Sequence, residues 1–204
     1  MPFEVEVHGQ MRRAAFLDRD GVINTDLGYV HRIEDFVFVD GTLEACAELV
    51  RLGWLLVVAT NQSGIGRGLY TERDFSMLTG WMKERFAQAG AALAGVYFCP
   101  HHPTDARDGF RLRCTCRKPE PGMLLSAQRE LSLDLGRSIL FGDKCEDLQA
   151  ARAAGIAHRV LLGKDGRAPP ADRCAPGLAA ACFASLREAV SSASLAPVLG
   201  QSHV

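Results

Sequence analysis

The sequence lacks an excess of charge of either sign: 23 Lys and Arg residues stand against 24 Asp and Glu, a formal net charge of −1 over 204 residues. Nucleic acid and acidic membrane surfaces attract strongly basic proteins, so we expect neither as a partner. The sequence also lacks an apolar run long enough to span a bilayer, and its first stretch, MPFEVEVHGQMRR, has no apolar segment of signal-peptide length. We therefore expect a cytoplasmic protein that does not bind membranes.

Internal repeats are also missing, and no linker precedes the Ala-rich stretch 168–204, so we expect one domain, residues 1–204. Several short runs rich in Val, Ile and Leu are apolar throughout rather than alternating. Such runs are typical of strands buried on both faces of a sheet. They occupy residues 14–17, 54–60, 94–100, 137–143 and 157–162.

Helical patterns separate these apolar runs. They cover residues 41–53, 71–90, 121–133 and 146–155. Thr71 and Asp74 have the spacing of a capping box at the start of the second helix. Alternating strands and helices predict an α/β fold, a Rossmann-like, mostly parallel sheet flanked by helices. Its core would span about residues 13–163, and the Ala-rich stretch 177–190 predicts one further helix in the C-terminal tail.

The first apolar run, in AAFLDRDGVIN, ends in two carboxylates, Asp18 and Asp20. Like charges this close repel, so something must compensate them, and a cation is the usual solution. Carboxylate oxygens suit a hard cation such as Mg²⁺. Gly21 permits the sharp turn that would let the two aspartates face different sides of a ligand.

Polar side chains also follow the other predicted strands. The carboxyl ends carry Asp18 and Asp20, Thr60 and Asn61, Cys99, and Asp143 and Lys144. Ligands bind at the carboxyl ends of parallel strands, so neighbouring strands would bring this set together. Strands also end in polar residues simply because they end at the surface. That alternative explains any one of these residues well and the whole set poorly.

The stretch RKPEPG places two cations, Arg117 and Lys118, just before a predicted helix. Arg offers a planar fork of donors for phosphate oxygens, and Lys supplies a compact charge. The Thr60 hydroxyl can donate to the same group. Together with the carboxylates, these residues predict a site for phosphoryl transfer.

A cluster of potential metal ligands lies just before these cations. Cys99, His101, Cys114 and Cys116 form a C-x-H…C-x-C pattern across a loop. Four such ligands predict a closed, structural zinc site that would hold Arg117 and Lys118, which directly follow Cys116, in place. Because the spacing is not the usual C-x₂-C, a set of reduced, partly buried thiols is the alternative. Of the other cysteines, we expect packing roles for Cys46, Cys145 and Cys182 and an exposed position for Cys174.

The stretches DRDGVIN, VVATNQSG, RKPEPGM and GDKCED resemble, in this order, the four motifs of the haloacid dehalogenase-like phosphatases. The resemblance implies that Asp18 is the nucleophile that takes the phosphoryl group as an aspartyl-phosphate. Asp20 would protonate the leaving oxygen and then deprotonate the attacking water. Mg²⁺ would be held by Asp18, the backbone carbonyl of Asp20 and Asp143, while Thr60 and Lys118 stabilise the transferring group.

A zinc-bearing loop before RKP is typical of one subgroup of this family, whose members hydrolyse heptose 1,7-bisphosphate or histidinol phosphate. The runs DLGYVHRIEDF, TNQSGIGRG and GDKCED and the long loop after CPHHP are similar to the heptose members. The resemblance therefore implies removal of one phosphate, at C7, from heptose 1,7-bisphosphate in nucleotide-activated heptose biosynthesis. The substrate-binding residues it implies are Asp26, Leu27, Gly28, Tyr29, Asn61, Gln62, Ser63, Arg117 and Lys144.

Two alternatives stay open: a histidinol-phosphate phosphatase, and a non-catalytic zinc-binding interaction module. The near-neutral charge counts against a nucleic-acid partner for such a module. The glycine-rich run 63–68 lacks the P-loop pattern, and we expect a flexible loop beside the active site. No room exists for a large cap domain after Gly21, so residues 26–39 must supply a minimal cap. We expect such a chain to act as a monomer.

Overall fold

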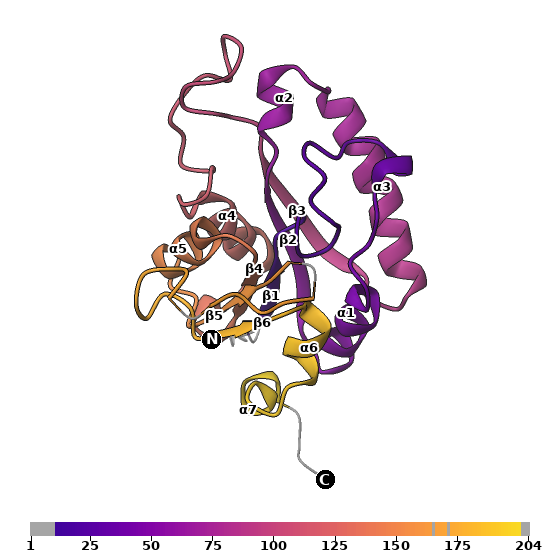
Figure 1. Cartoon of the computed structure of the whole chain (residues 1–204), viewed down its shortest axis with the longest axis vertical. Helices are drawn as coiled ribbons and strands as arrows, with labels where there is room; N and C mark the ends of the chain where they lie inside the picture. Colours follow the sequence, from indigo (N-terminus) through magenta and orange to yellow (C-terminus); the bar gives the residue numbers. More distant parts are fainter. Residues whose placement is uncertain (1–10, 165, 171, 201–204) are drawn as a thin grey trace, which may run out of the picture.

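A parallel sheet of six strands forms the centre of the molecule in a computed structural model that describes residues 11–164, 166–170 and 172–200 (Figure 1). The strands are β1 (Ala14–Leu17), β2 (Leu55–Asn61), β3 (Leu93–Cys99), β4 (Ile139–Gly142), β5 (His158–Leu162) and β6 (Ala181–Phe183). Their order is β3-β2-β1-β4-β5-β6, and every pair is parallel. The predicted α/β fold with a parallel sheet is confirmed. β1 lies at its centre, so its carboxyl end opens between two neighbouring strands.

Helices cover both faces of this sheet. They are α1 (Thr42–Arg51), α2 (Ser63–Arg67), α3 (Glu72–Gln88), α4 (Gly122–Leu131), α5 (Cys145–Ala153), α6 (Leu186–Ser191) and α7 (Ala196–Leu199), with 3₁₀ turns at Ile33–Asp35 and Leu135–Arg137. Alternate strand residues enter two separate cores: Leu17 packs with residues of α1, α3 and α6, whereas Phe16 packs with residues of α4 and α5. Two apolar layers per strand explain why the strand sequences do not alternate.

The start of α3 agrees with its sequence signal. Thr71 is the N-cap, and its hydroxyl accepts a hydrogen bond from the Asp74 N–H at 3.1 Å. The Asp74 carboxylate accepts one in return from the Thr71 N–H at 2.8 Å. This predicted capping box satisfies two backbone donors that a helix start leaves free.

The C-terminal segment differs from its prediction. Residues 181–183 form β6, which pairs with β5, and a helix begins only at Leu186, after the N-cap Ser185. The expectation of one helix over 177–190 is therefore wrong. The edge of β5 offers unpaired backbone groups, and pairing with them outweighs the helix propensity of alanine.

Two further expectations are corrected. Residues 63–67, predicted as a flexible loop, form the short helix α2. Cys174, expected to be exposed, is buried and forms a disulfide with Cys145 across a separation of 29 residues. The bond fastens the loop after β5 to the first turn of α5. A pairing so distant in sequence depends on tertiary structure, which the spacing of cysteines does not reveal.

Residues 26–39 run along the surface after β1 and contain a single 3₁₀ turn, Ile33–Asp35. Asn24 and Phe38 pair across the base of this segment in an isolated antiparallel bridge. Nothing larger is inserted between β1 and α1, as expected for a minimal cap. Within the ranges that the structure describes, no helix combines the length and apolar character needed to cross a membrane.

Candidate active site

A buried lysine between two carboxylates forms the centre of the site. The Lys118 ammonium donates a hydrogen bond to Asp18 Oδ1 at 2.9 Å and lies 2.6 Å from Asp147 Oδ1. It also donates to the Ala59 carbonyl at 2.7 Å. Burial alone would lower the pKa of Lys118, but Asp147 and Asp18 raise it above its ordinary value. The lysine is therefore charged, and its three donors are fixed.

Asp143 is a buried carboxylate without a hydrogen-bonded cation; the nearest ammonium groups, those of Lys164 and Lys144, lie 3.5 and 4.0 Å from its oxygens. Its side chain is 0% exposed, and neither Oδ1 nor Oδ2 has a hydrogen-bond partner. Burial, together with the negative charge of Asp18, raises the pKa of Asp143 to about 6. A buried ionised carboxylate with no donor is costly unless a cation compensates it.

The carboxylates of Asp18, Asp143 and Asp147 each offer an oxygen within 4.8 Å of the others. Lys118 already compensates the charges of Asp18 and Asp147. The carboxylate oxygens without a hydrogen-bond partner are therefore those of Asp143. An oxygen-only ligand set with orphaned buried oxygens fits a hard divalent cation. Asp18 and Asp143, both predicted as magnesium ligands from the sequence, are the residues that would hold it.

Asp147 was not predicted, although it stands in the quoted motif GDKCED. Besides its contact with Lys118, its Oδ2 accepts a hydrogen bond from the Lys144 N–H at 3.0 Å. The spacing from Lys144 to Asp147, that of a helix N-cap and its N3 residue, could have revealed the second contact.

Asp20 faces a different set of partners from Asp18. Its carboxylate accepts hydrogen bonds from Arg19 Nη2 at 2.9 and 3.0 Å, from Asn24 Nδ2 at 3.0 Å and from Gln62 Nε2 at 3.0 Å. The Tyr70 hydroxyl donates to Gln62 Oε1 at 2.6 Å, which fixes the orientation of that amide. Burial raises the pKa of Tyr70 to about 12, so the hydroxyl keeps its proton.

Residues at the end of β2 support the centre from the side. Asn61 forms two hydrogen bonds with the backbone of Lys118, each 3.1 Å long. Gln62 also donates from Nε2 to the Thr60 hydroxyl at 2.9 Å and is 2% exposed. Both residues were predicted to contact substrate, and the structure shows that their amides hold other site residues.

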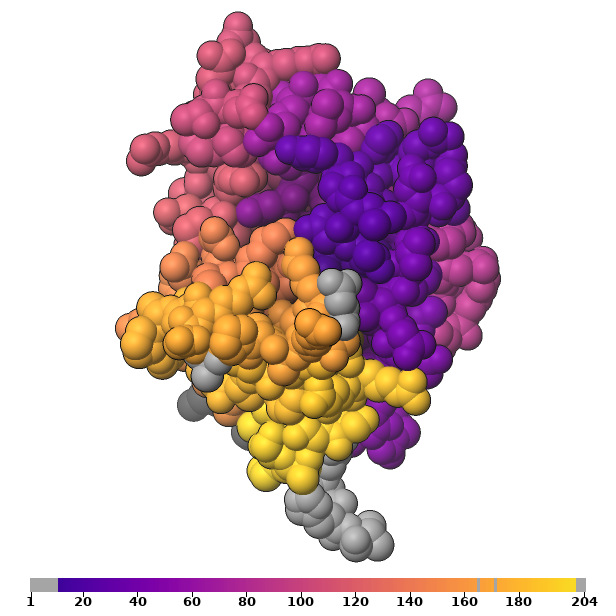
Figure 2. Space-filling model, viewed as in Figure 1, coloured from indigo at the N-terminus to yellow at the C-terminus, as the bar shows by residue number. Residues whose placement is uncertain are grey.

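A cavity of about 440 Å³ opens over these groups. Figure 2 shows the surface hollowed where segments from different parts of the chain meet. The cavity is lined by Asp18, Asp20, Asp26, Gly28, Tyr29, Thr60, Asn61, Gln62, Ser63, Tyr70, Arg117, Lys118, Lys144, Glu146 and Asp147. Of the predicted substrate residues, Leu27 alone does not line it and instead points to solvent, 62% exposed. Sequence reasoning missed Tyr70 and Glu146, besides Asp147, because it did not show that their side chains face the cavity.

Two lysines flank Asp26 beside this cavity. Lys144 Nζ donates to Asp26 Oδ2 at 3.3 Å, and Lys164 Nζ lies 3.8 Å from the same oxygen. Burial by itself would raise the pKa of Asp26. The charge of Lys144 and the hydrogen bond from the Gly28 N–H outweigh that effect, so the pKa lies below its ordinary value. Asp26 is therefore ionised, and it holds the end of Lys144 toward the cavity.

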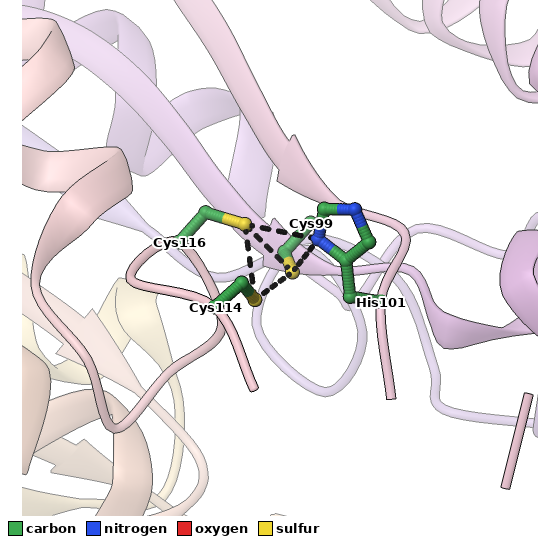
Figure 3. A group of neighbouring side chains, drawn as sticks. All are labelled: Cys99, His101, Cys114 and Cys116. Carbon is green, nitrogen blue, oxygen red and sulfur yellow. Dashed lines mark hydrogen bonds between the residues drawn. The ribbon is translucent and has the colours of Figure 1, made fainter. Parts of the chain in front are cut away.

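The predicted metal ligands on the loop after β3 converge on one point (Figure 3). The three sulfur atoms of Cys99, Cys114 and Cys116 lie 3.0–3.5 Å apart, and His101 Nδ1 lies 3.4 Å from Cys116 Sγ. Ligands around a tetrahedral zinc ion with Zn–S bonds of about 2.3 Å would stand slightly farther apart, roughly 3.7 Å. Three thiols and an imidazole facing one another fit zinc.

This loop contacts the active site at its C-terminal end, and its outer part contacts α2. Arg117, directly after Cys116, donates to the His101 carbonyl at 3.1 Å. On the other side, the Arg107 N–H donates to the Gly66 carbonyl of α2 at 2.8 Å, and Arg67 pairs with Asp105. A side chain on Gly66 would collide with the Pro100 carbonyl and with Phe110, which shows how closely the loop packs on α2.

The chain is similar to known proteins in sequence and in structure. Residues 115–189 match the family model described as HAD-hydrolase-like. A HAD-like phosphatase from Mesorhizobium loti superposes with a TM-score of 0.76 and 35% identity, covering 94% of this chain and 86% of that one. The D,D-heptose 1,7-bisphosphate phosphatase from B. bronchiseptica, solved with magnesium and phosphate, superposes with a TM-score of 0.66 and 37% identity, covering 74% and 80%.

The fold, the four motifs and these matches agree, and the chain belongs to the haloacid dehalogenase-like hydrolases. It is an enzyme, a phosphoric monoester hydrolase, as predicted. A relative from Photorhabdus laumondii is 54% identical over 149 residues, which cover 73% of this chain and 79% of the relative. That relative is named D-glycero-beta-D-manno-heptose-1,7-bisphosphate 7-phosphatase.

Proposed function

We propose that this enzyme removes the 7-phosphate from D-glycero-β-D-manno-heptose 1,7-bisphosphate. The observation that carries the proposal is the cavity in which Asp18, Lys118 and Arg117 stand together. It supplies a nucleophile and separate cations for two phosphates. The 54% identity to a phosphatase of that name supports the same substrate.

Asp18 is the nucleophile in this mechanism. Its carboxylate attacks phosphorus, the bond from phosphorus to the sugar oxygen breaks, and the phosphoryl group becomes bound to Asp18. A covalent intermediate splits one difficult hydrolysis into two easier steps. Lys118, 2.9 Å from Asp18, holds the attacking group in position and neutralises the charge of the transferring phosphoryl oxygens. The Thr60 hydroxyl donates to the same oxygens.

Asp20 moves the protons. It gives a proton to the leaving sugar oxygen and then takes one from the water that attacks the intermediate. Donors from Arg19, Asn24 and Gln62 hold its carboxylate away from the Asp18–Lys118 pair. The two aspartates thus have different environments and separate roles.

Mg²⁺ bound to Asp18, Asp143 and the backbone carbonyl of Asp20 would supply positive charge to the phosphoryl oxygens. The orphaned oxygens of Asp143 support this assignment. The relative from B. bronchiseptica was solved with magnesium and phosphate, which supports the same ion here.

The remote phosphate and the sugar would contact the rim of the cavity. Arg117 is half-buried and fixed by the His101 carbonyl, so its guanidinium is available in one orientation for a phosphate. Lys144, Asp26, Gly28, Tyr29 and Ser63 line the remaining wall. Asn61 and Gln62 would act mainly by holding Lys118 and Asp20.

The test is phosphate release in Mg²⁺ with the 1,7-bisphosphate and with histidinol phosphate. We expect kcat/KM to favour the bisphosphate by about a hundredfold, equivalent to about 2.7 kcal/mol of transition-state discrimination. An Arg117→Ala variant should lose most of that preference while still hydrolysing histidinol phosphate. A wild-type preference for histidinol phosphate would reject the substrate and keep the phosphatase assignment. No turnover of either compound would favour a zinc-binding interaction module.

We further propose that Cys99, His101, Cys114 and Cys116 bind Zn²⁺ and that the chain acts as a monomer in the cytoplasm. The convergence of four ligand atoms supports the zinc site. Metal analysis of purified protein and its mass in solution by light scattering test the first two statements.

A further inference from the structure

The four inner strands of the sheet, β2, β1, β4 and β5, each end in or are followed by polar residues at the active-site edge. The polar residue that follows β5, Lys164, has no role in the proposed mechanism. Lys164 comes two residues after the end of β5. Its Nζ lies 3.5 Å from Asp143 Oδ2 and 3.8 Å from Asp26 Oδ2. The Gly163 N–H donates to the Phe183 carbonyl at 2.8 Å, which ties the start of this loop to β6.

The position of Lys164 differs from that of the other lysines near the site. Lys118 is buried and hydrogen-bonded to Asp18. Lys144 is hydrogen-bonded to Asp26 and lies farther from Asp143 than Lys164 does, 4.0 Å from Oδ1. Lys164 has close ionic contacts with two carboxylates but no hydrogen bond to either, and its side chain is 48% exposed. It also lines a second cavity, of about 470 Å³, that adjoins Asp26 and Gly21. Its ammonium group can therefore move away from Asp143 into open space.

Asp143 is the carboxylate whose oxygens fit a divalent cation, and Lys164 lies beside one of those oxygens. Two positive charges beside one carboxylate repel each other, and the partial exposure of Lys164 to water weakens this repulsion without removing it. We propose that Lys164 competes with Mg²⁺ for Asp143 and thereby sets the Mg²⁺ affinity of the enzyme. When Mg²⁺ binds, the ammonium of Lys164 turns toward Asp26 and the adjoining cavity. The inference rests on the magnesium site of the proposed function.

The test is Mg²⁺ binding to the full chain, measured by calorimetry without substrate. Removing the competing charge in Lys164→Met should lower the Kd for Mg²⁺ by roughly three- to tenfold. Lys164→Arg keeps the charge and should stay within about twofold of wild type. Lys83→Met, on the exposed surface of α3, is the matched control and should not change the Kd.

An unchanged or higher Kd in Lys164→Met, with normal binding by wild type, would overturn the inference and leave the proposed function intact. If wild type bound no Mg²⁺, the magnesium site and the inference would fall together. Lys164→Gln provides the same readout if the methionine variant does not fold. The Mg²⁺-induced rise in Tm is a second readout, and it should be larger in the charge-removing variants than in wild type.

Discussion

Individual buried charges give this site its chemistry. Lys118 lies between Asp18 and Asp147, so one cation satisfies two carboxylates at the floor of the cavity. Asp143 receives no such donor. A buried charge is tolerated only when it is paired, so the difference between these carboxylates indicates where a cation belongs.

Asp18→Asn should abolish turnover without unfolding the chain. A neutral amide is a poor nucleophile, but it has the same shape and can still accept a hydrogen bond from Lys118. We expect kcat to fall by at least about a thousandfold, while Tm remains near that of wild type. Phosphate release and thermal unfolding measure the two effects. Full activity in this variant would reject Asp18 as the nucleophile.

The pKa of Asp143, about 6, predicts a pH dependence. The folded pKa lies above the ordinary value of 3.8, so the folded chain holds a proton that the unfolded chain releases between pH 3.8 and about 6. Considering Asp143 alone, the metal-free protein loses stability as the pH rises from 3.8 to about 6. Mg²⁺ requires the ionised form, so its affinity should fall as pH drops below about 6. Calorimetry at pH 7.5 and 5.5 measures this change.

The Asp143→Asn variant distinguishes the role of Asp143 in Mg²⁺ binding from its effect on stability. The variant removes a buried charge that Asp18 repels and that has no hydrogen bond, only longer ionic contacts with Lys164 at 3.5 Å and Lys144 at 4.0 Å. The metal-free protein should therefore have a higher Tm than wild type at pH 7.5. Mg²⁺ should no longer raise its Tm. A lower Tm without metal would mean that the ionic contacts of Asp143 with Lys164 and Lys144 outweigh the cost of burying its charge.

At the scale of elements, the loop after β3 is held between two parts of the site. Its cysteines and His101 gather at its base, Arg117 leaves from one end, and α2 packs against its outer part. Because the loop contains little regular structure, a metal bound at its base, as we propose, would be the main constraint on the position of Arg117.

Cys114→Ser should release zinc and weaken substrate binding. A neutral hydroxyl is a poor zinc ligand, and without the metal Arg117 loses its fixed support. We expect bound zinc to be lost and KM to rise about tenfold, with a smaller change in kcat. Cys182→Ser, a half-buried thiol outside the cluster, is the control and should keep its zinc. Unchanged zinc content in Cys114→Ser would reject the metal site.

At the scale of the whole molecule, the C-terminal segment completes the main core. Leu186, Leu195 and Leu199 are buried with residues of β1, β2 and α1 in one apolar cluster. The Trp54 indole N–H donates to the Leu199 carbonyl at 3.2 Å. Figure 1 places α7 at the end of the molecule opposite the loop after β3, so this segment supports the fold rather than the site.

Leu199→Ala should therefore reduce stability and leave catalysis unchanged. Truncating a fully buried leucine costs roughly 2–5 kcal/mol of unfolding free energy. Chemical denaturation measures this loss, and kcat/KM should equal that of wild type. Val198→Ala, on a half-buried side chain of the same helix, should cost less. An equal effect from the two variants would contradict the placement of Leu199 in the core.

The sequence by itself determined the local elements and the chemistry of the site. Continuous apolar runs predicted strands buried on both faces. The carboxyl ends of three of these strands indicated Asp18, Thr60 and Asp143 as site residues. The cysteine spacing named the ligands that converge in the loop. These features could be predicted because strand burial, helix caps and motif order depend on residues that are close together in the sequence.

Only the tertiary structure decided how distant groups share their partners. The roles of Asp147 beside Lys118, of Gln62 between Asp20 and Thr60, and of Lys164 beside Asp143 depend on contacts between separate strands and helices. The strand at 181–183 and the bond between Cys145 and Cys174 depend on them as well. Local propensity cannot determine such pairings, because hydrogen bonds, charge compensation and sheet edges act between residues that meet only after the chain has folded.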